Sequence, residues 1–204
     1  MKNALTRIRL TALVIMSLLL LSACGSTKVS RVSSSEEIAL TDKWNDKDSQ
    51  LVAEAMINDM LDFPWIDKHL KKEGSNPAII IQRVRNKSHE QIAVETFLND
   101  LKRAILRSGR ADFVANRDVR NDVRAERADQ EFNASLTTQK EMGEELGADY
   151  ALVGSINSSV DQLDGKRVTA YQVDLSLIDM TTNREVWNGQ KKLKKYQERS
   201  SFGF

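Results

Sequence analysis

Hydrophobic residues recur along this chain with two periods, of three to four residues in some segments and of two in others. Residues 44–49 offer several helix-capping side chains, and the apolar positions that follow have helical spacing: Val52, Ala55, Met56, Met60 and Phe63. This pattern predicts a first helix that ends near Pro64. A stronger pattern covers residues 91–108, whose apolar face carries Val94, Phe97, Leu98, Leu101 and Ile105. It predicts an amphipathic helix with Gly109 just past its end.

The period of two is clearest near the end of the chain. Tyr171, Val173, Leu175 and Leu177 alternate with polar residues, which predicts a strand with one buried face. Residues 78–84 form a run rich in Ile and Val that predicts a buried central strand, followed by a turn at residues 86–90. Three further strands are predicted, at residues 111–115, 150–156 and 184–193, the last after a turn at residues 179–183.

Less regular segments separate these elements. Residues 64–77 look like a polar connector, and residues 118–128 like a polar helix. Thr138 and Glu141 form a capping box for a short helix that runs through Leu146 and ends at Gly147. The predicted order is α-β-α-β-α-α-β-β-β. It favours an α/β (α+β) domain: a single mixed sheet of about four to five strands, helices packed on its faces, and an antiparallel C-terminal meander.

The amino terminus has the organisation of a secretory signal. Lys2, Arg7 and Arg9 precede an apolar run that is too short to span a membrane and ends at the sequence Leu-Ser-Ala-Cys, residues 21–24. Cys24 is the only cysteine of the chain, and a lipobox reading explains it as a lipidated first residue. Ordinary signal cleavage beside an unrelated cysteine, or an uncleaved anchor, is the alternative. Gly25 follows the cysteine, which favours the outer membrane of a Gram-negative host.

We therefore expect a signal peptide at residues 1–23, a lipidated N-terminus and flexible tether at residues 24–43, and one domain at residues 44–204. The tether is free of proline, and its nineteen residues after Cys24 reach at most about 65 Å. Without the signal, 27 basic and 29 acidic residues remain, so the charge balance does not indicate nucleic-acid binding.

Catalytic and metal-binding patterns are not evident in the sequence. His69 and His89 are separated by 20 residues in polar surroundings and are predicted to be surface residues. The glycines form no phosphate-binding motif, and lipidation would occupy the only thiol. We predict no enzyme activity, no metal and no cofactor apart from the covalent lipid on Cys24.

Two groups of cations allow two interpretations each. Arg117, Arg120, Arg124 and Arg127 lie on one side of the polar helix, where they could bind an acidic partner, or could pair with carboxylates of the same helix. Residues 191–195 contain four lysines that could form a basic patch, although lysines on an edge strand more often block pairing with another sheet. Trp44 and Trp187 are predicted to be packing residues.

Several motifs together resemble the LpoB family of penicillin-binding-protein activators. They are the lipobox, the Trp-Asn-Asp of residues 44–46, the Ile-Ile-Gln-Arg-Val-Arg-Asn of residues 80–86, the Leu-Gly-Ala-Asp-Tyr of residues 146–150 and the hairpin at residues 179–187. The resemblance covers residues 44–195. It implies a non-catalytic outer-membrane lipoprotein that binds a class A penicillin-binding protein and stimulates peptidoglycan synthesis, and so takes part in cell shape.

Two features depart from the enteric members of that family, in which the tether is long and rich in proline and the position of Gln82 holds an acidic residue near the docking surface. We expect Gln82, Arg83, Arg117, Arg120 and Arg124 to bind the partner, and the protein to be a monomer. A structural or accessory lipoprotein of an envelope or secretion complex is the alternative, because a short tether suits a partner near the same membrane. A small-ligand binding module ranks last, because no group of polar residues converges in the sequence.

Overall fold

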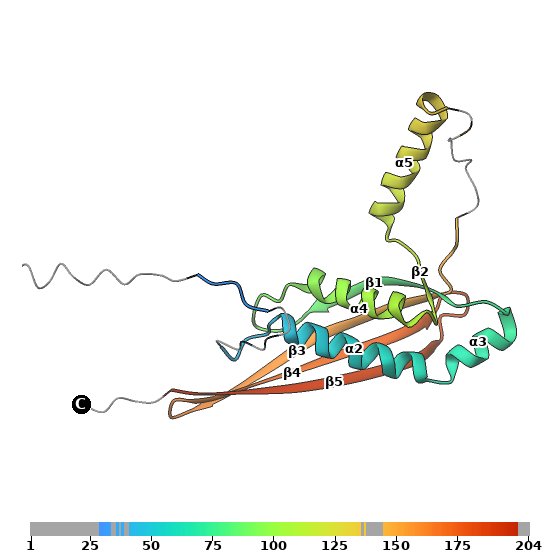
Figure 1. Cartoon of the computed structure of the whole chain (residues 1–204). Helices are drawn as coiled ribbons and strands as arrows, with labels where there is room; N and C mark the ends of the chain where they lie inside the picture. Colours follow the sequence, from blue (N-terminus) through green and yellow to red (C-terminus); the bar gives the residue numbers. More distant parts are fainter. Residues whose placement is uncertain are drawn as a thin grey trace, which may run out of the picture. The chain divides into compact units, whose positions relative to one another are not determined.

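The structure is a computed structural model that describes residues 29–33, 36, 38, 41–135, 137 and 145–199. Its folded part is built on one five-stranded sheet in the order β2-β1-β3-β4-β5 (Figure 1). The strands are β1 (Ala78–Asn86), β2 (Asp112–Phe113), β3 (Tyr150–Leu163), β4 (Lys166–Asp179) and β5 (Glu185–Glu198). β1 runs parallel to β2 and β3, whereas β3, β4 and β5 form an antiparallel meander. The predicted fold class is confirmed.

Two helices cover one face of this sheet. They are α2 (Asp46–Asp62) and α4 (Val94–Ser108), which pack on each other, on β5 and on β1 (Figure 1). The apolar face of α4 buries Phe97, Leu101 and Ile105, as its spacing predicts. The alternating side chains of β4 meet it from the sheet, so that Tyr171, Leu175 and Leu177 are each at most 1% exposed. The core therefore lies between the helices and a single face of the sheet.

The segment that follows the first helix is a second helix, so the predicted polar connector is wrong. α3 (Trp65–Glu73) starts directly after Pro64 and ends at Gly74, whose φ of 72° is left-handed. Trp65, Ile66 and His69 bury one side of this short helix. Three buried positions in nine residues are too few for a recognisable period, and burial against neighbouring elements decides the conformation.

The meander is longer than its hydrophobic pattern suggests. β3 and β4 pair over their whole lengths and are joined by Asp164 and Gly165, with φ of 47° and 77°. Positive φ at both positions defines a two-residue turn that matches the twist of the strands, and Asp-Gly is a typical sequence for it. The outer halves of these strands are mostly exposed or half-buried. They lack the buried face that made residues 171–177 recognisable.

The other predicted elements are confirmed with shifted bounds or lie outside the described residues. β2 has only two residues, and the polar helix is α5 (Arg117–Asn133), which has no buried residue. Thr138 and Glu141 of the predicted capping box lie outside the described residues. The prediction that this short helix runs through Leu146 is wrong, because residues 145–148 are in neither a helix nor a strand.

Asp42, which the sequence assigns to the tether, is held by the folded domain. Its side chain is 6% exposed, accepts a hydrogen bond from the Thr169 hydroxyl and lies 2.7 Å from Nε of Arg167. The Tyr171 hydroxyl donates to the Asp42 carbonyl oxygen at 3.0 Å. These contacts place the start of the folded domain at or before Asp42. Cys24 lies outside the described residues, and among those described no helix has the length and apolar character needed to cross a membrane.

Candidate partner-binding groove

A β-bulge in β1 decides which side chains reach the sheet face that α2 and α4 leave uncovered. Ile79 and Ile81 pair with Tyr150 and Leu152 on the covered face, and the register then shifts between Ile81 and Arg83. Gln82 is the extra residue of this bulge. Because one inserted residue reverses the alternation of a strand, Val84 is buried in the core and the arginines on either side of it face outward.

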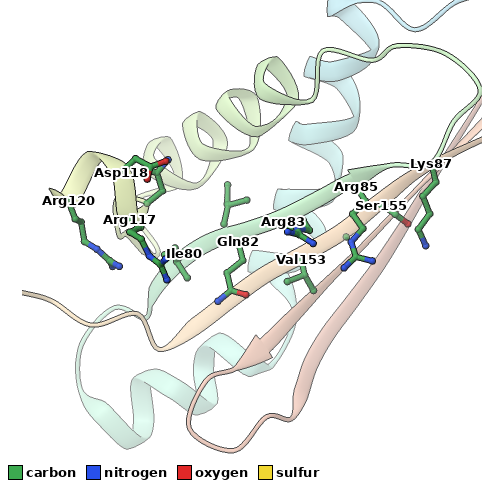
Figure 2. A pocket seen from close by; sticks show the side chains of 13 residues that line it. Ile80, Gln82, Arg83, Arg85, Lys87, Arg117, Asp118, Arg120, Val153 and Ser155 are labelled. Carbon is green, nitrogen blue, oxygen red and sulfur yellow. The ribbon is translucent and has the colours of Figure 1, made fainter. Parts of the chain in front are cut away.

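The bulge places the arginines of β1 in an open groove (Figure 2). The groove has a volume of about 1040 Å³ and is formed by β1, β3 and the first turn of α5. Ile80 and Val153 are among its apolar lining residues. Its charged residues are five cations and one acid: Arg83, Arg85, Lys87, Arg117 and Arg120, with Asp118. Such a lining favours an anionic partner surface.

The first turn of α5 brings two of these cations to the sheet. Asn116 caps the helix, because its side-chain oxygen accepts a hydrogen bond from the Val119 amide at 3.0 Å. The cap fixes where the helix begins, and Figure 2 shows Arg117 beside Ile80 at the start of β1. In the described part of the chain, the arginines with ion pairs are Arg103, Arg110, Arg124 and Arg167. The cations of the groove are not among them.

Arg120 also carries an unsatisfied donor. Its Nε atom is buried and has no hydrogen-bond partner among the described residues. A buried donor without a partner costs free energy.

Four of the five predicted docking residues thus line one groove: Gln82, Arg83, Arg117 and Arg120. Arg124 does not. Its guanidinium donates to both carboxylate oxygens of Glu145, at 2.8 and 2.7 Å, and this hydrogen bonding raises the pKa of Arg124 and lowers that of Glu145. Arg124 therefore ties α5 to the segment before β3. Its partner is not one of the helix carboxylates that the alternative interpretation had assigned to it.

Arg85 and Lys87 are groove residues that sequence reasoning missed. They come directly after Gln82 and Arg83 in the chain. The sequence signal for them is that apolar residues stop alternating regularly at Gln82, which indicates a bulge there. Without knowledge of the bulge, residues 78–84 have the pattern of one fully buried strand. The structure therefore corrects the prediction of a fully buried strand: β1 is buried on one face and open on the other.

Histidine 69 is not a surface residue, contrary to the prediction. It is 7% exposed, and its Nδ1 lies 3.1 Å from the Tyr150 hydroxyl, whose pKa is raised by burial. His89 is exposed as predicted, with its Nδ1 2.7 Å from the Ser158 hydroxyl. Among the described residues, no three or more His, Cys, Asp or Glu side chains are grouped so that they could hold a metal ion.

The predicted packing roles of the two tryptophans are confirmed. Trp187 is 3% exposed and donates to Asp59 at 2.9 Å, and half-buried Trp44 meets the Tyr171 ring edge-on. The lysines of residues 191–195 lie on β5, which is an edge strand within the described sheet. One of them, Lys195, is 2.5 Å from Asp48, while the others are exposed.

A mixed sheet with helices on one face and an open cationic groove on the other defines this molecule as an α+β domain. The chain belongs to the LpoB family, described as peptidoglycan-synthase activators, whose model matches residues 48–193.

The solved structures that match this chain include the LpoB C-terminal domain from Escherichia coli, at 17% identity and a TM-score of 0.38, covering 65% of this chain and 94% of that one. The LpoB C-terminal domain from Salmonella enterica has 19% identity and a TM-score of 0.37, with the same shares covered. Lipoprotein GNA1162 from Neisseria meningitidis has 13% identity and a TM-score of 0.40, covering 62% of this chain and 88% of that one. No curated protein sequence matches this chain.

Proposed function

We propose that this chain is an outer-membrane lipoprotein that binds a class A penicillin-binding protein and stimulates its synthesis of peptidoglycan. Membership of a family of peptidoglycan-synthase activators carries the proposal. The lipobox at Cys24 supports it from the sequence, because a lipid anchor would keep the domain in the envelope where such synthases act. The protein itself would supply binding energy and no chemistry.

The cationic groove is the proposed docking surface. Gln82 and Arg83 come from β1, and Arg117 and Arg120 from α5, so two elements distant in sequence present one surface. A complementary acidic surface on the synthase would speed association and set orientation. Arg124 would act indirectly, because its ion pair with Glu145 holds α5 to the segment that leads into β3.

A reconstituted synthesis assay tests the function. The purified full chain is added in detergent to a class A penicillin-binding protein of the same host, and glycan polymerisation and cross-linking from lipid-linked precursor are followed. Stimulation of both activities by at least twofold is expected. If the wild-type chain binds and stimulates none of the host's class A synthases, the proposal fails.

Charge reversal tests the docking surface in the same assay. Arg83→Glu combined with Arg117→Glu is expected to weaken synthase binding at least tenfold, because two attractive contacts become repulsive. Lys192→Glu combined with Lys194→Glu is the matched control, since it reverses two exposed cations on the same face of the sheet at β5. Equal losses in the two variants would show that net charge, and not the groove, determines binding.

One observation favours the accessory-lipoprotein alternative. Because Asp42 is held by the domain, at most residues 25–41 separate Cys24 from it, and seventeen residues reach at most about 60 Å. A partner close to the anchoring membrane would suit that length. Co-purification of the chain in a stable complex of outer-membrane proteins, without a synthase, would support this second function.

A further inference from the structure

The groove lies beside a strand edge that β2 leaves unpaired. β2 pairs with β1 only at Ala78 and Ile79, and the chain then departs toward α5. Within the described residues, the outer edge of β1 from Ile80 to Asn86 has no neighbouring strand. A free edge is a template for another strand, and protein partners use such edges by adding an extended segment.

The direction of the backbone groups on β1 follows from one hydrogen bond. The Lys87 amide donates to the Ile156 carbonyl oxygen at 2.8 Å, so Lys87 faces β3. The backbone groups of alternate residues in a strand point to the same side. The amide and carbonyl groups of Arg83 and Arg85 therefore point toward β3, and those of Val84 and Asn86 point away from it, to the outer edge. The outer edge thus presents backbone donors and acceptors next to the groove.

The side chains along this edge have a regular spacing. Arg83, Arg85 and Lys87 lie in order along the open face of β1 (Figure 2), two residues apart and therefore separated by roughly 6.6 Å. An added strand would have the same repeat, so an acidic residue at every second position would stand beside each cation in turn.

We propose that an extended segment of the partner protein, with acidic residues at alternate positions, adds to the outer edge of β1 as a sixth strand of the sheet. The added strand would continue the position of β2 in the sheet beyond Phe113, where β2 ends. It would lie between the cations of β1 and those of α5. That the partner is a synthase rests on the proposed function; the mode of binding does not.

Synthetic peptides separate strand addition from simple charge attraction. The probe is a nine-residue peptide of alternating Glu and Thr, and its binding to the full chain in detergent is measured by fluorescence anisotropy. The first control has the same sequence with alternate backbone amides methylated, which removes strand hydrogen bonds and keeps the charge. The second control replaces every Glu by Lys. We expect the methylated peptide to bind at least tenfold more weakly and the Lys peptide not to bind.

A protein variant completes the test. Arg83→Gln combined with Arg85→Gln is expected to weaken binding of the acidic peptide at least tenfold, whereas Lys192→Gln combined with Lys194→Gln changes it less than twofold. Equal binding of the methylated and unmethylated peptides, or no binding of the acidic peptide to the wild-type chain, would overturn the proposal. Because the peptide controls use the wild-type chain, they hold even if the double variant fails to fold.

Failure of this inference is distinguishable from failure of the proposed function. If the chain stimulates a synthase but does not bind the acidic peptide, strand addition is refuted and the activator function is supported. If the chain binds the acidic peptide but stimulates no class A synthase, strand addition is supported and the proposed function fails. The partner would then be another envelope protein.

Discussion

Asp42 shows how a single residue can define the boundary of this domain. Its neighbours in sequence are polar, yet its carboxylate is buried against β4 and accepts from Thr169 beside the Arg167 guanidinium. The hydrogen bond from Thr169 and the charge of Arg167 lower the pKa of Asp42, against the opposing effect of burial. The folded state therefore stabilises the charged carboxylate of Asp42 more than the unfolded chain does.

This geometry predicts a pH-dependent effect of Asp42→Asn. A carboxyl whose pKa is lowered on folding contributes stability above its unfolded pKa of 3.8, and loses it as pH falls through the folded value. At pH 7 the variant should lose about 1–3 kcal/mol in free energy of unfolding. The difference from wild type should shrink below about pH 4. Urea unfolding at a series of pH values measures both effects.

Asp161→Asn is the matched control, because Asp161 is exposed on β3. It should change the free energy of unfolding by less than about 0.5 kcal/mol. A constant difference between Asp42→Asn and wild type from pH 7 down to pH 3 would contradict the ion-pair account.

At the scale of elements, the contact of β3 with β4 depends on a missing side chain. A Cβ atom added at Gly154 would lie 2.3 Å from the Asp174 carbonyl oxygen and 2.5 Å from Cδ2 of Leu175. The first of these atoms belongs to the backbone and cannot rotate away. Gly154 therefore lets the Leu175 side chain fill the core directly across the pair.

Gly154→Ala should destabilise the domain by about 1–3 kcal/mol, through overpacking of the meander. Thermal and urea unfolding followed by circular dichroism measure the loss. Gly147→Ala is the control, since a Cβ atom there meets nothing within 4 Å and no positive φ is involved. Similar destabilisation by the two substitutions would indicate a general effect of losing glycine, independent of the Leu175 contact.

At the scale of the whole molecule, the tether length becomes a functional variable. Residues 25–41 are available between the proposed lipid site and the domain, which limits reach to about 60 Å. If the partner is a synthase of the opposite membrane, the tether has little length to spare.

Deleting ten residues from the tether should therefore abolish function in cells while leaving stimulation by the detergent-solubilised chain unchanged. Cell shape and incorporation of labelled peptidoglycan precursor provide the measurement in cells. An equal-length tether in which the same ten residues are replaced by Gly and Ser is the control, and it should retain function. Full activity of the shortened chain in cells would favour a partner near the anchor, and hence the accessory role.

Most of the elements could be predicted from sequence because their signals are local. The spacing of Phe97, Leu101 and Ile105, and the alternation around Leu175, follow from the geometry of a helix and of a strand. α3 could not be predicted in this way, because burial of Trp65 and His69 depends on contacts made by distant elements such as β3. The same reason explains the wrong assignment of His69 to the surface.

The groove was only partly predictable. Arg117 and Arg120 are recognisable as one side of a polar helix, but nothing local says that this helix begins beside β1. The sequence by itself determined most of the secondary structure, the family resemblance and the lipid site expected at Cys24, because these depend on short-range patterns. Only the tertiary structure decided that a bulge at Gln82 turns Arg83 and Arg85 outward and that Arg124 pairs with Glu145. These outcomes depend on strand register and on contacts between segments far apart in the chain.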